Sequence, residues 1–178
     1  RWGVICVMQA FSHLSGARRS LEHAVIGRRA CEVEWDLLEM LDPREQAPSA
    51  RARGQYAPPA VGLHDRPSAV ELLEAARGGL GEHALPALAG RAQFEVRVAL
   101  RALGMVAREL ALVGEHEPAR QRALAGLGVA DEAGLAAAIR AGELAGREHE
   151  VHGALRELVR AKLEVANPRY LEGAGTRT

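Results

Sequence analysis

Hydrophobic residues recur every three or four positions along the longest patterned stretch of the chain, from Arg91 to Val113. This spacing is typical of one face of an α-helix. A second, weaker line runs beside the first, so the buried sector is wide enough to contact neighbours on two sides. We expect this stretch to be the central helix of a bundle. The first line comprises Val96, Leu100, Leu103, Val106, Ala107, Leu110 and Val113, and the second comprises Phe94, Val98, Ala102, Met105 and Leu112.

Residues 1–42 show helical periodicity in two shorter runs. The first run, Trp2 to Phe11, is apolar nearly all round, and the second keeps helical spacing as far as Leu41. We therefore predict a helical hairpin over residues 1–42. Two isolated helices cannot hide this much apolar surface. We expect the hairpin to dock on the rest of the chain, on a second copy or on a missing domain.

Residues 43–66 break the pattern and predict a flexible linker. Proline and glycine interrupt regular helix, and the Arg, Ser and Gln content leaves little to bury. The interrupting residues are Pro43, Pro48, Pro58, Pro59, Gly54 and Gly62.

Start and stop signals divide residues 67–171 into several helices. Ser68 and Glu71 have capping-box spacing, in which each side chain accepts a hydrogen bond from the other residue's backbone amide. We expect Gly114 to end the central helix and Asp131 to cap the start of a later one. The predicted fold class is all-α, with a helical hairpin, a flexible linker and then a five- or six-helix bundle.

The last long helix should run from about Arg147 to Ala166 and stop at Asn167, which precedes a proline. We expect Tyr170 to fold back onto the bundle. Residues 172–178 are predicted to be a disordered tail.

Composition supports a helical core and excludes two classes of partner. Hydrophobic residues make up 48% of the chain but aromatic residues only 3%, so the core must be built from Leu, Val and Ala. Basic and acidic residues both number 23, whereas a nucleic-acid-binding protein normally has a basic excess or a basic stripe. No apolar run approaches the roughly 20 residues of a membrane span. We expect no nucleic-acid partner and no membrane partner.

The two cysteines and the first ten residues indicate the cellular compartment in which the protein is expected. Cys6 and Cys31 lie among apolar residues, which favours buried free thiols in a reducing compartment. The apolar run from Trp2 to Ala10 lacks the pattern of a signal peptide. We therefore expect a cytoplasmic protein. Because Arg1 stands in the middle of an apolar pattern, we also expect the chain to be the tail of something longer.

Two segments resemble parts of known proteins. The first segment is RWGVICVMQAFSHLSGARRSLEHAVIGRRACEVEWDLLEMLD. It resembles the C-terminal end of bacterial kinases similar to aminoglycoside phosphotransferases, in the branch related to acyl-CoA-dehydrogenase-associated kinases. The second segment is the remainder of the chain, from DRPSAVELLEAARGGL through the central helix to ANPRYL. It resembles the uncharacterised helical domain often appended to such kinases. The resemblance implies an accessory part of a kinase that acts on a hydroxyl-bearing small molecule or an acyl derivative.

The chemistry of a kinase is missing from this sequence. Phosphoryl transfer needs contacts to the nucleotide phosphates, an Asp that positions the acceptor hydroxyl, and ligands for magnesium. His64 and Asp65 are adjacent and have no Asn at the required distance, and the one lysine, Lys162, lies on the inward line of the last helix. We expect no catalytic residue, no cofactor and no enzyme activity in this chain alone.

A truncated metal motif occurs near the start of the last long helix. His149, Glu150 and His152 resemble the zinc motif HExxH, but the histidines are three rather than four residues apart. No third ligand is evident. We interpret the group as a solvated helix start and predict no metal site.

Arg97, Arg101 and Arg108 should form a stripe on one side of the central helix, because they are four and seven residues apart. Such a stripe can hold a phosphate or a carboxylate. We favour the interpretation as a solvated face interleaved with Glu95 and Glu109. These three arginines are the candidate anion-binding residues.

Two functions from different classes fit these patterns. The first is a non-catalytic helical accessory domain that docks on a phosphotransferase-like kinase, helps it to dimerise or covers its substrate. Its partner would be the kinase domain or a second copy of this chain, bound through the apolar hairpin. The second is a small-molecule or acyl-group-binding bundle whose anion site is lined by Arg97, Arg101 and Arg108.

Overall fold

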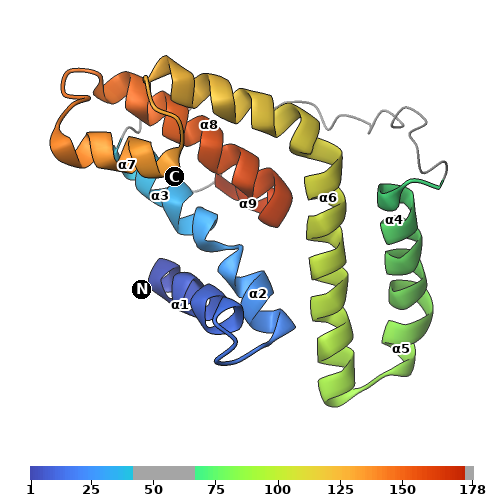
Figure 1. Cartoon of the computed structure of the whole chain (residues 1–178). Helices are drawn as coiled ribbons and strands as arrows, with labels where there is room; N and C mark the ends of the chain where they lie inside the picture. The colour runs from blue at the N-terminus through green and yellow to red at the C-terminus, as the bar shows by residue number, and fades with distance from the viewer. Residues whose placement is uncertain (42–66, 175–178) are drawn as a thin grey trace. The chain divides into compact units, whose positions relative to one another are not determined.

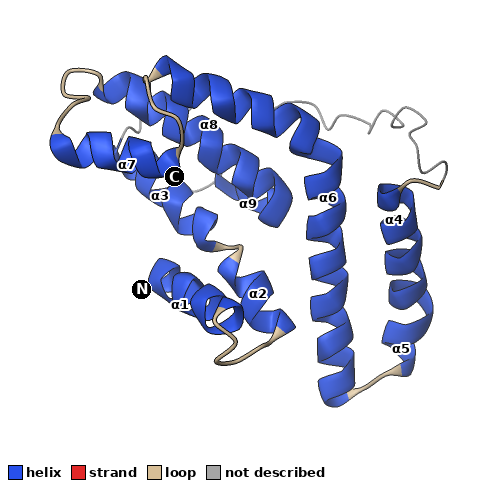
Figure 2. Cartoon of the chain, in the orientation of Figure 1, coloured by secondary structure: helices blue, strands red, loops and turns tan. Residues whose placement is uncertain are grey.

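A computed structural model describes residues 1–41 and 67–174, and within these ranges the chain is built from helices joined by turns and loops (Figures 1 and 2). The predicted all-α fold class is confirmed. The predicted linker 43–66, with His64 and Asp65, lies outside the described residues. Of the predicted tail, residues 175–178 also lie outside them, while residues 172–174 belong to the last helix.

Ten helical segments lie within the described ranges. In chain order, α1 spans Trp2–Leu14, α2 spans Leu21–Gly27, α3 spans Ala30–Leu41 and α4 spans Ala69–Gly79. A π-helical turn, Leu80–Ala84, leads into α5, Leu85–Ala87. The remaining helices are α6 (Gly90–Gly126), α7 (Glu132–Ala141), α8 (Glu148–Ala166) and α9 (Pro168–Ala174).

The described residues divide into two compact units. Unit 1 contains residues 1–30 and 67–112, which form α1, α2, α4, α5 and the first part of α6. Unit 2 contains residues 31–41 and 113–174, which form nearly all of α3, the rest of α6, and α7 to α9. Both units therefore draw on the predicted hairpin and on the predicted bundle.

In unit 1, α1 and α2 pack closely as a short hairpin. The backbone amide of Ser20 donates a hydrogen bond to Nδ1 of His13 (3.1 Å), and the Ser20 hydroxyl accepts from the amide of His23. This N-cap starts α2. The opposite side of α2 contacts α6, because Val25 packs in a buried cluster with Val98 and Met105. An ion pair between Arg28 and Glu109 adds a second link between these segments.

Gly27 sets how closely α1 and α2 approach. A Cβ at this position would lie 2.7 Å from the Cβ of Ala10, which is shorter than any normal contact. We expect Gly27→Ala to destabilise unit 1 by about 1–3 kcal/mol, since the two helices must separate. Gly78→Ala is the matched control, because a Cβ there meets nothing within 4 Å and alanine favours helix. Urea unfolding followed by circular dichroism measures both, and a G27A variant as stable as G78A would contradict the close approach.

Unit 2 has two apolar clusters that meet along α8. One cluster joins α3 to α8 and consists of Cys31, Trp35, Leu38, Val159, Leu163 and Ala166, with Leu155, Tyr170 and Leu171 packed against it. The other joins the end of α6, α7 and α8, and consists of Leu124, Leu127, Leu135, Ala138, Leu144 and Leu158. The helix α8 is therefore the central element of unit 2.

Several local signals in the sequence are confirmed. Ser68 and Glu71 form the complete capping box at the start of α4. The carboxylate of Asp131 accepts a hydrogen bond from the amide of Gly134 (2.7 Å) at the start of α7. Helix α8 ends at Ala166, and Tyr170 packs back against the α3–α8 cluster.

Two predicted helix boundaries are wrong. The second helix of the predicted hairpin is two helices, α2 and α3, separated at Arg28 and Arg29. The predicted end of the central helix at Gly114 is also wrong, because α6 continues to Gly126 with Pro118 inside it. Proline removes one backbone donor and glycine lowers helix propensity, but tertiary contacts of the following turns outweigh both effects here.

The expected ranking of the two apolar lines of the central helix is wrong only in part, because Ala107 of the stronger line is buried and Phe94 of the weaker line is 37% exposed. Val98 and Met105, from the weaker line, are buried. Val106, Leu110 and Val113, from the stronger line, are 46–52% exposed. The reason is that α2 places Val25 on the side of the weaker line, a choice of neighbour that periodicity cannot reveal.

Candidate functional site

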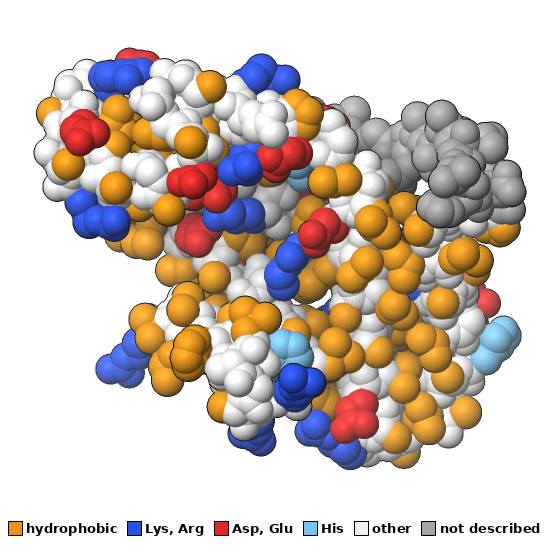
Figure 3. All heavy atoms as spheres, viewed as in Figure 1, with side chains coloured by type: hydrophobic (Ala, Val, Ile, Leu, Met, Phe, Trp, Pro, Cys, Tyr) orange, Lys and Arg blue, Asp and Glu red, His pale blue; other side chains and the backbone are white. Residues whose placement is uncertain are grey.

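In unit 1, α1 carries more exposed large apolar side chains than any other helix among the described residues. Five apolar side chains of this helix are between 61% and 82% exposed. We call this surface the α1 face, and it consists of Val4, Val7, Met8, Phe11 and Leu14. Figure 3 shows hydrophobic side chains gathered over the part of the molecule that α1 forms. The face projects into solvent because α1 buries only Cys6, on its opposite side.

The spacing within the α1 face indicates what kind of surface it complements. Val4, Val7, Phe11 and Leu14 alternate separations of three and four residues, which is the a and d spacing of helices that pack side by side. The five side chains expose on the order of 600 Å², at the upper limit of the largest apolar patch on a typical monomer. Patches of this size mark interaction surfaces.

The three candidate arginines of the central helix differ in their exposure and in their contacts. Arg97 donates a hydrogen bond to the Gln93 side chain (2.7 Å), one turn earlier in α6. Arg97 and Arg101 are exposed, whereas Arg108 is half-buried. The residue that approaches Arg108 is Arg77 of α4, which the sequence did not single out. Both guanidinium groups lie over Gly104. A glycine within the arginine stripe is the sequence feature that could have indicated a close neighbour at this point of the helix.

The residues of the truncated metal motif lie in different environments, with His149 and Glu150 exposed to solvent and His152 buried. His149 is exposed, as the interpretation of a solvated helix start requires. For His152 that interpretation is wrong, because its ring is buried and its Nε2 lies 2.9 Å from the backbone oxygen of Leu38. Glu150 is held by Arg147, whose hydrogen bond lowers the pKa of that carboxyl. Among the residues that the structure describes, no group of three His, Cys, Asp or Glu side chains is placed to hold a metal ion.

Both cysteines are free and buried, as the sequence indicated. Cys31 lies in the α3–α8 cluster, and burial raises the pKa of its thiol to about 11, with smaller contributions from Glu34 and Glu32. A thiol with this pKa is almost entirely protonated at neutral pH and is a poor nucleophile. Cys31 is therefore a core residue.

The polar residues of α3 are used in contacts with α8 and α9. The Glu32 carboxylate accepts from Nδ2 of Asn167 (2.8 Å), and the Asp36 carboxylate accepts from the Tyr170 hydroxyl (2.8 Å). Each of these bonds joins α3 to the end of the chain. They are structural links, and they explain why α3 belongs to unit 2.

Basic residues of α8 complete the contact with α3. Arg156 and Arg160 lie over the Trp35 ring, with their guanidinium carbons 4.7 and 5.1 Å from its centroid. Arg156 also pairs with Glu39, and Lys162 lies 3.5 Å from Glu34. Lys162 is about half exposed, so the expectation that it lies on an inward line is wrong.

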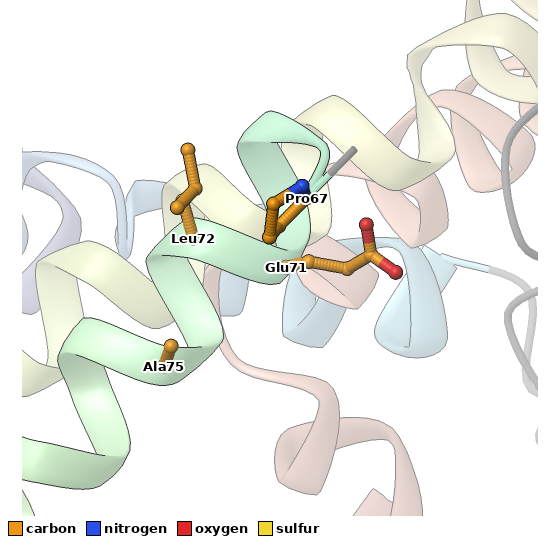
Figure 4. Close-up of a pocket in the computed structure, with 4 residues that line it drawn as sticks. All are labelled: Pro67, Glu71, Leu72 and Ala75. Atoms are coloured by element: carbon orange, nitrogen blue, oxygen red, sulfur yellow. The ribbon is translucent and has the colours of Figure 1, made fainter. Parts of the chain in front are cut away.

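A shallow pocket of about 450 Å³ lies at the start of α4 (Figure 4). Its lining residues are Pro67, Glu71, Leu72 and Ala75. The one ionisable side chain among them, Glu71, accepts a hydrogen bond from the Ser68 amide (2.7 Å) as part of the capping box. None of the three candidate arginines is among the residues that line this pocket.

The described residues thus define an all-helical protein of two compact units, with an exposed apolar helix face as its main surface feature. Residues 86–170 match the profile of a family described as Domain of unknown function (DUF6285). The match runs from α5 into α9 and covers just under half of the chain. It supports the expectation of an uncharacterised helical domain in the second part, and the α1 face lies outside it. No curated protein and no solved structure matches the chain.

The structure also bears on membranes. Within residues 1–41 and 67–174, no helix is both long enough and apolar enough to cross a bilayer.

Proposed function

We propose that this chain is a non-catalytic accessory module that docks, through the α1 face, on the catalytic part of a phosphotransferase-like kinase. The observation that carries the proposal is the α1 face itself: a helix with five exposed apolar side chains that nothing in unit 1 covers among the described residues. A soluble chain gains free energy by burying such a surface against a partner.

The choice of partner rests on where the α1 face lies. It falls within residues 1–42, the segment that resembles the end of an aminoglycoside-phosphotransferase-like kinase. In a protein of that kind this segment would be in contact with the catalytic part. The a and d spacing further favours a helical surface as the complement. The same proposal places the chain in the cytoplasm with its kinase, where its free thiols would stay reduced.

A binding titration tests the proposal. The full chain is mixed with the purified catalytic part of an aminoglycoside-phosphotransferase-like kinase, ending before the segment that resembles residues 1–42, and the complex is followed by sedimentation velocity. We expect Phe11→Asp to weaken binding by at least about 30-fold, because a carboxylate would be buried at the centre of the contact. The matched control is Met40→Asp, at a 78% exposed residue of α3, and it should bind like the parent chain.

Three outcomes contradict docking on the kinase. In the first, the parent chain does not bind the kinase. In the second, F11D binds as well as M40D does. In the third, the parent chain sediments as a dimer that F11D converts to a monomer while neither binds the kinase, which assigns the α1 face to self-association. Circular dichroism of F11D confirms that the helices are retained in the variant.

A further inference from the structure

The surface of α8 that α3 covers combines apolar side chains with basic ones. We propose that this surface is a recognition site for an acidic amphipathic helix with a tryptophan anchor, and that α3 is the tethered ligand that occupies it in this chain. The proposal concerns unit 2 and is independent of the α1 face. We call the surface the α3 site, and it consists of Val159, Leu163, Ala166, Arg156, Arg160 and Lys162.

The part of unit 2 that carries the α3 site has a core of its own. Within the described ranges, the buried cluster that joins the end of α6, α7 and α8 includes no residue of α3. His116 of α6 pairs with Glu164 of α8 (Nε2 to Oε2, 2.9 Å), and Arg147 donates to the backbone oxygen of Gly126 (2.8 Å). Because none of these contacts involves α3, we expect α6, α7 and α8 to stay packed together when α3 is released.

The helix α3 comes to this surface from a distant part of the chain. It ends at Leu41, and the next helical part of unit 2 begins at Val113. The helices that precede it, α1 and α2, belong to unit 1. It also lies outside residues 86–170, the range that matches the domain of unknown function, whereas α7 and α8 lie within that range. The matched domain therefore binds α3 as an element from outside its own range.

The charges and the anchor of this contact are those of an interface. The helix α3 carries four acidic residues and neither lysine nor arginine. Glu39 pairs with Arg156, and Glu34 lies 3.5 Å from Lys162. The Trp35 side chain is 4% exposed, and the guanidinium carbon of Arg156 lies 4.7 Å from its ring centroid. Tryptophan and arginine dominate the binding energy of protein interfaces. The α3 site therefore fits an acidic helix with one buried tryptophan.

Polar contacts fix the direction in which the bound helix lies. Nε2 of the buried His152 lies 2.9 Å from the backbone oxygen of Leu38, and this nitrogen donates because a carbonyl only accepts. Leu38 is in the last turn of α3, where the carbonyl groups of a helix become available to side-chain donors. Asn167 donates to the Glu32 carboxylate near the start of α3 (2.8 Å). A helix laid in the opposite direction could not satisfy both contacts.

Fluorescence anisotropy of a labelled peptide tests the α3 site in the full chain. The peptide has the sequence of α3, Ala30–Leu41, with blocked ends, in reducing buffer. Glu34→Lys combined with Glu39→Lys in the chain turns two ion pairs into repulsion and should release its own α3. We expect the peptide to bind E34K/E39K at least about tenfold more tightly than the parent chain, whose tethered α3 competes for the site. The control E82K/E143K reverses two exposed glutamates on other elements and should bind like the parent chain.

Variant peptides test what the site recognises. A peptide with Trp35→Ala should bind the released chain at least about 30-fold more weakly, because the anchor is lost. A peptide with Leu37→Ala should bind within about twofold of the native peptide, since this side chain is 53% exposed and alanine favours helix. Equal binding of these two peptides would overturn the proposal.

Amide hydrogen exchange of the same samples shows whether α3 and α7 stay protected. If α3 stays protected in E34K/E39K, the chain with Trp35→Ala is the second released variant. Absence of peptide binding to a released variant would overturn the proposal. So would an α3 that stays protected in both variants, because neither the ion pairs nor the tryptophan would then hold it. Loss of protection in α7 on release of α3 would make α3 a part of the core that unit 2 cannot lose, which also contradicts the proposal.

Discussion

Replacing Trp35 with alanine is expected to destabilise unit 2 by about 3–5 kcal/mol. The Trp35 side chain is 4% exposed and lies in the cluster that joins α3 to α8. Its removal leaves a cavity and takes away the ring over which Arg156 and Arg160 lie. Because α3 then loses its largest apolar contact, we expect it to detach from α8 before the rest of unit 2 unfolds.

The readout must report on unit 2 alone, since the two units need not unfold together. Amide hydrogen exchange in α8 supplies it, because exchange through local opening speeds up as the contact weakens. The control is Leu37→Ala on the same helix, at a side chain that is 53% exposed, with an expected cost below about 1 kcal/mol. If W35A and L37A exchanged alike in α8, the assignment of α3 to unit 2 would be wrong.

Replacing Leu163 with alanine is expected to cost about 2–5 kcal/mol. Leu163 is completely buried in the same cluster, one turn before the end of α8. Removing its isopropyl group loses the free energy of transfer from water and leaves a cavity between α3 and α8, and polar bonds from Asn167 and Tyr170 also tie α3 to the end of the chain. The surroundings therefore have little freedom to collapse into the space.

Urea denaturation measures the loss as a shift of the midpoint at constant slope. Ile139→Ala in α7 is the control, since its side chain is 44% exposed and far less apolar area is lost from the core. A midpoint for L163A equal to that of I139A would mean that the α3–α8 cluster does not hold unit 2 together.

Features encoded by neighbouring residues were predictable from the sequence. The capping box of Ser68 and Glu71, the N-cap at Asp131 and the helix end before Asn167 each depend on hydrogen bonds within one turn. The fold class followed from periodicity and from the scarcity of aromatic residues. These signals need no knowledge of what packs against the helix.

Features that depend on distant residues were not predictable. Val98 and Met105 were ranked below Val106 and Leu110, and only the position of Val25 on α2 decides which pair is buried. Periodicity gives the direction of an apolar line but not its neighbour.

The division of the hairpin is a second example. Residues 21–42 have continuous helical spacing, yet the chain turns at Arg28 and Arg29 and α3 joins α8 and α9. The sequence feature that indicates this contact is the set of acidic residues on α3, which are Glu32, Glu34, Asp36 and Glu39. Glu39 and Glu34 pair with Arg156 and Lys162 of α8. Glu32 and Asp36 accept hydrogen bonds from polar groups at the end of the chain. Matching charges on segments more than 100 residues apart cannot be paired without the fold.

The candidate sites also combine features that the sequence indicates with features that depend on distant residues. The sequence identified the arginine stripe, but the approach of Arg77 to Arg108 depends on α4 lying beside α6. The sequence also indicated that the first helix has more apolar surface than a hairpin can bury. The structure identifies the residues of that helix that remain uncovered, and they lie outside the range that matches the domain of unknown function.

Amide hydrogen exchange of the full chain, with and without the kinase catalytic part, tests docking through the α1 face most directly. The account predicts that exchange in residues 2–14 slows at least about tenfold in the complex, while exchange in α7, Glu132–Ala141, is unchanged. Slower exchange in other helices with no change in residues 2–14, or no slowing anywhere at saturating kinase, would contradict it.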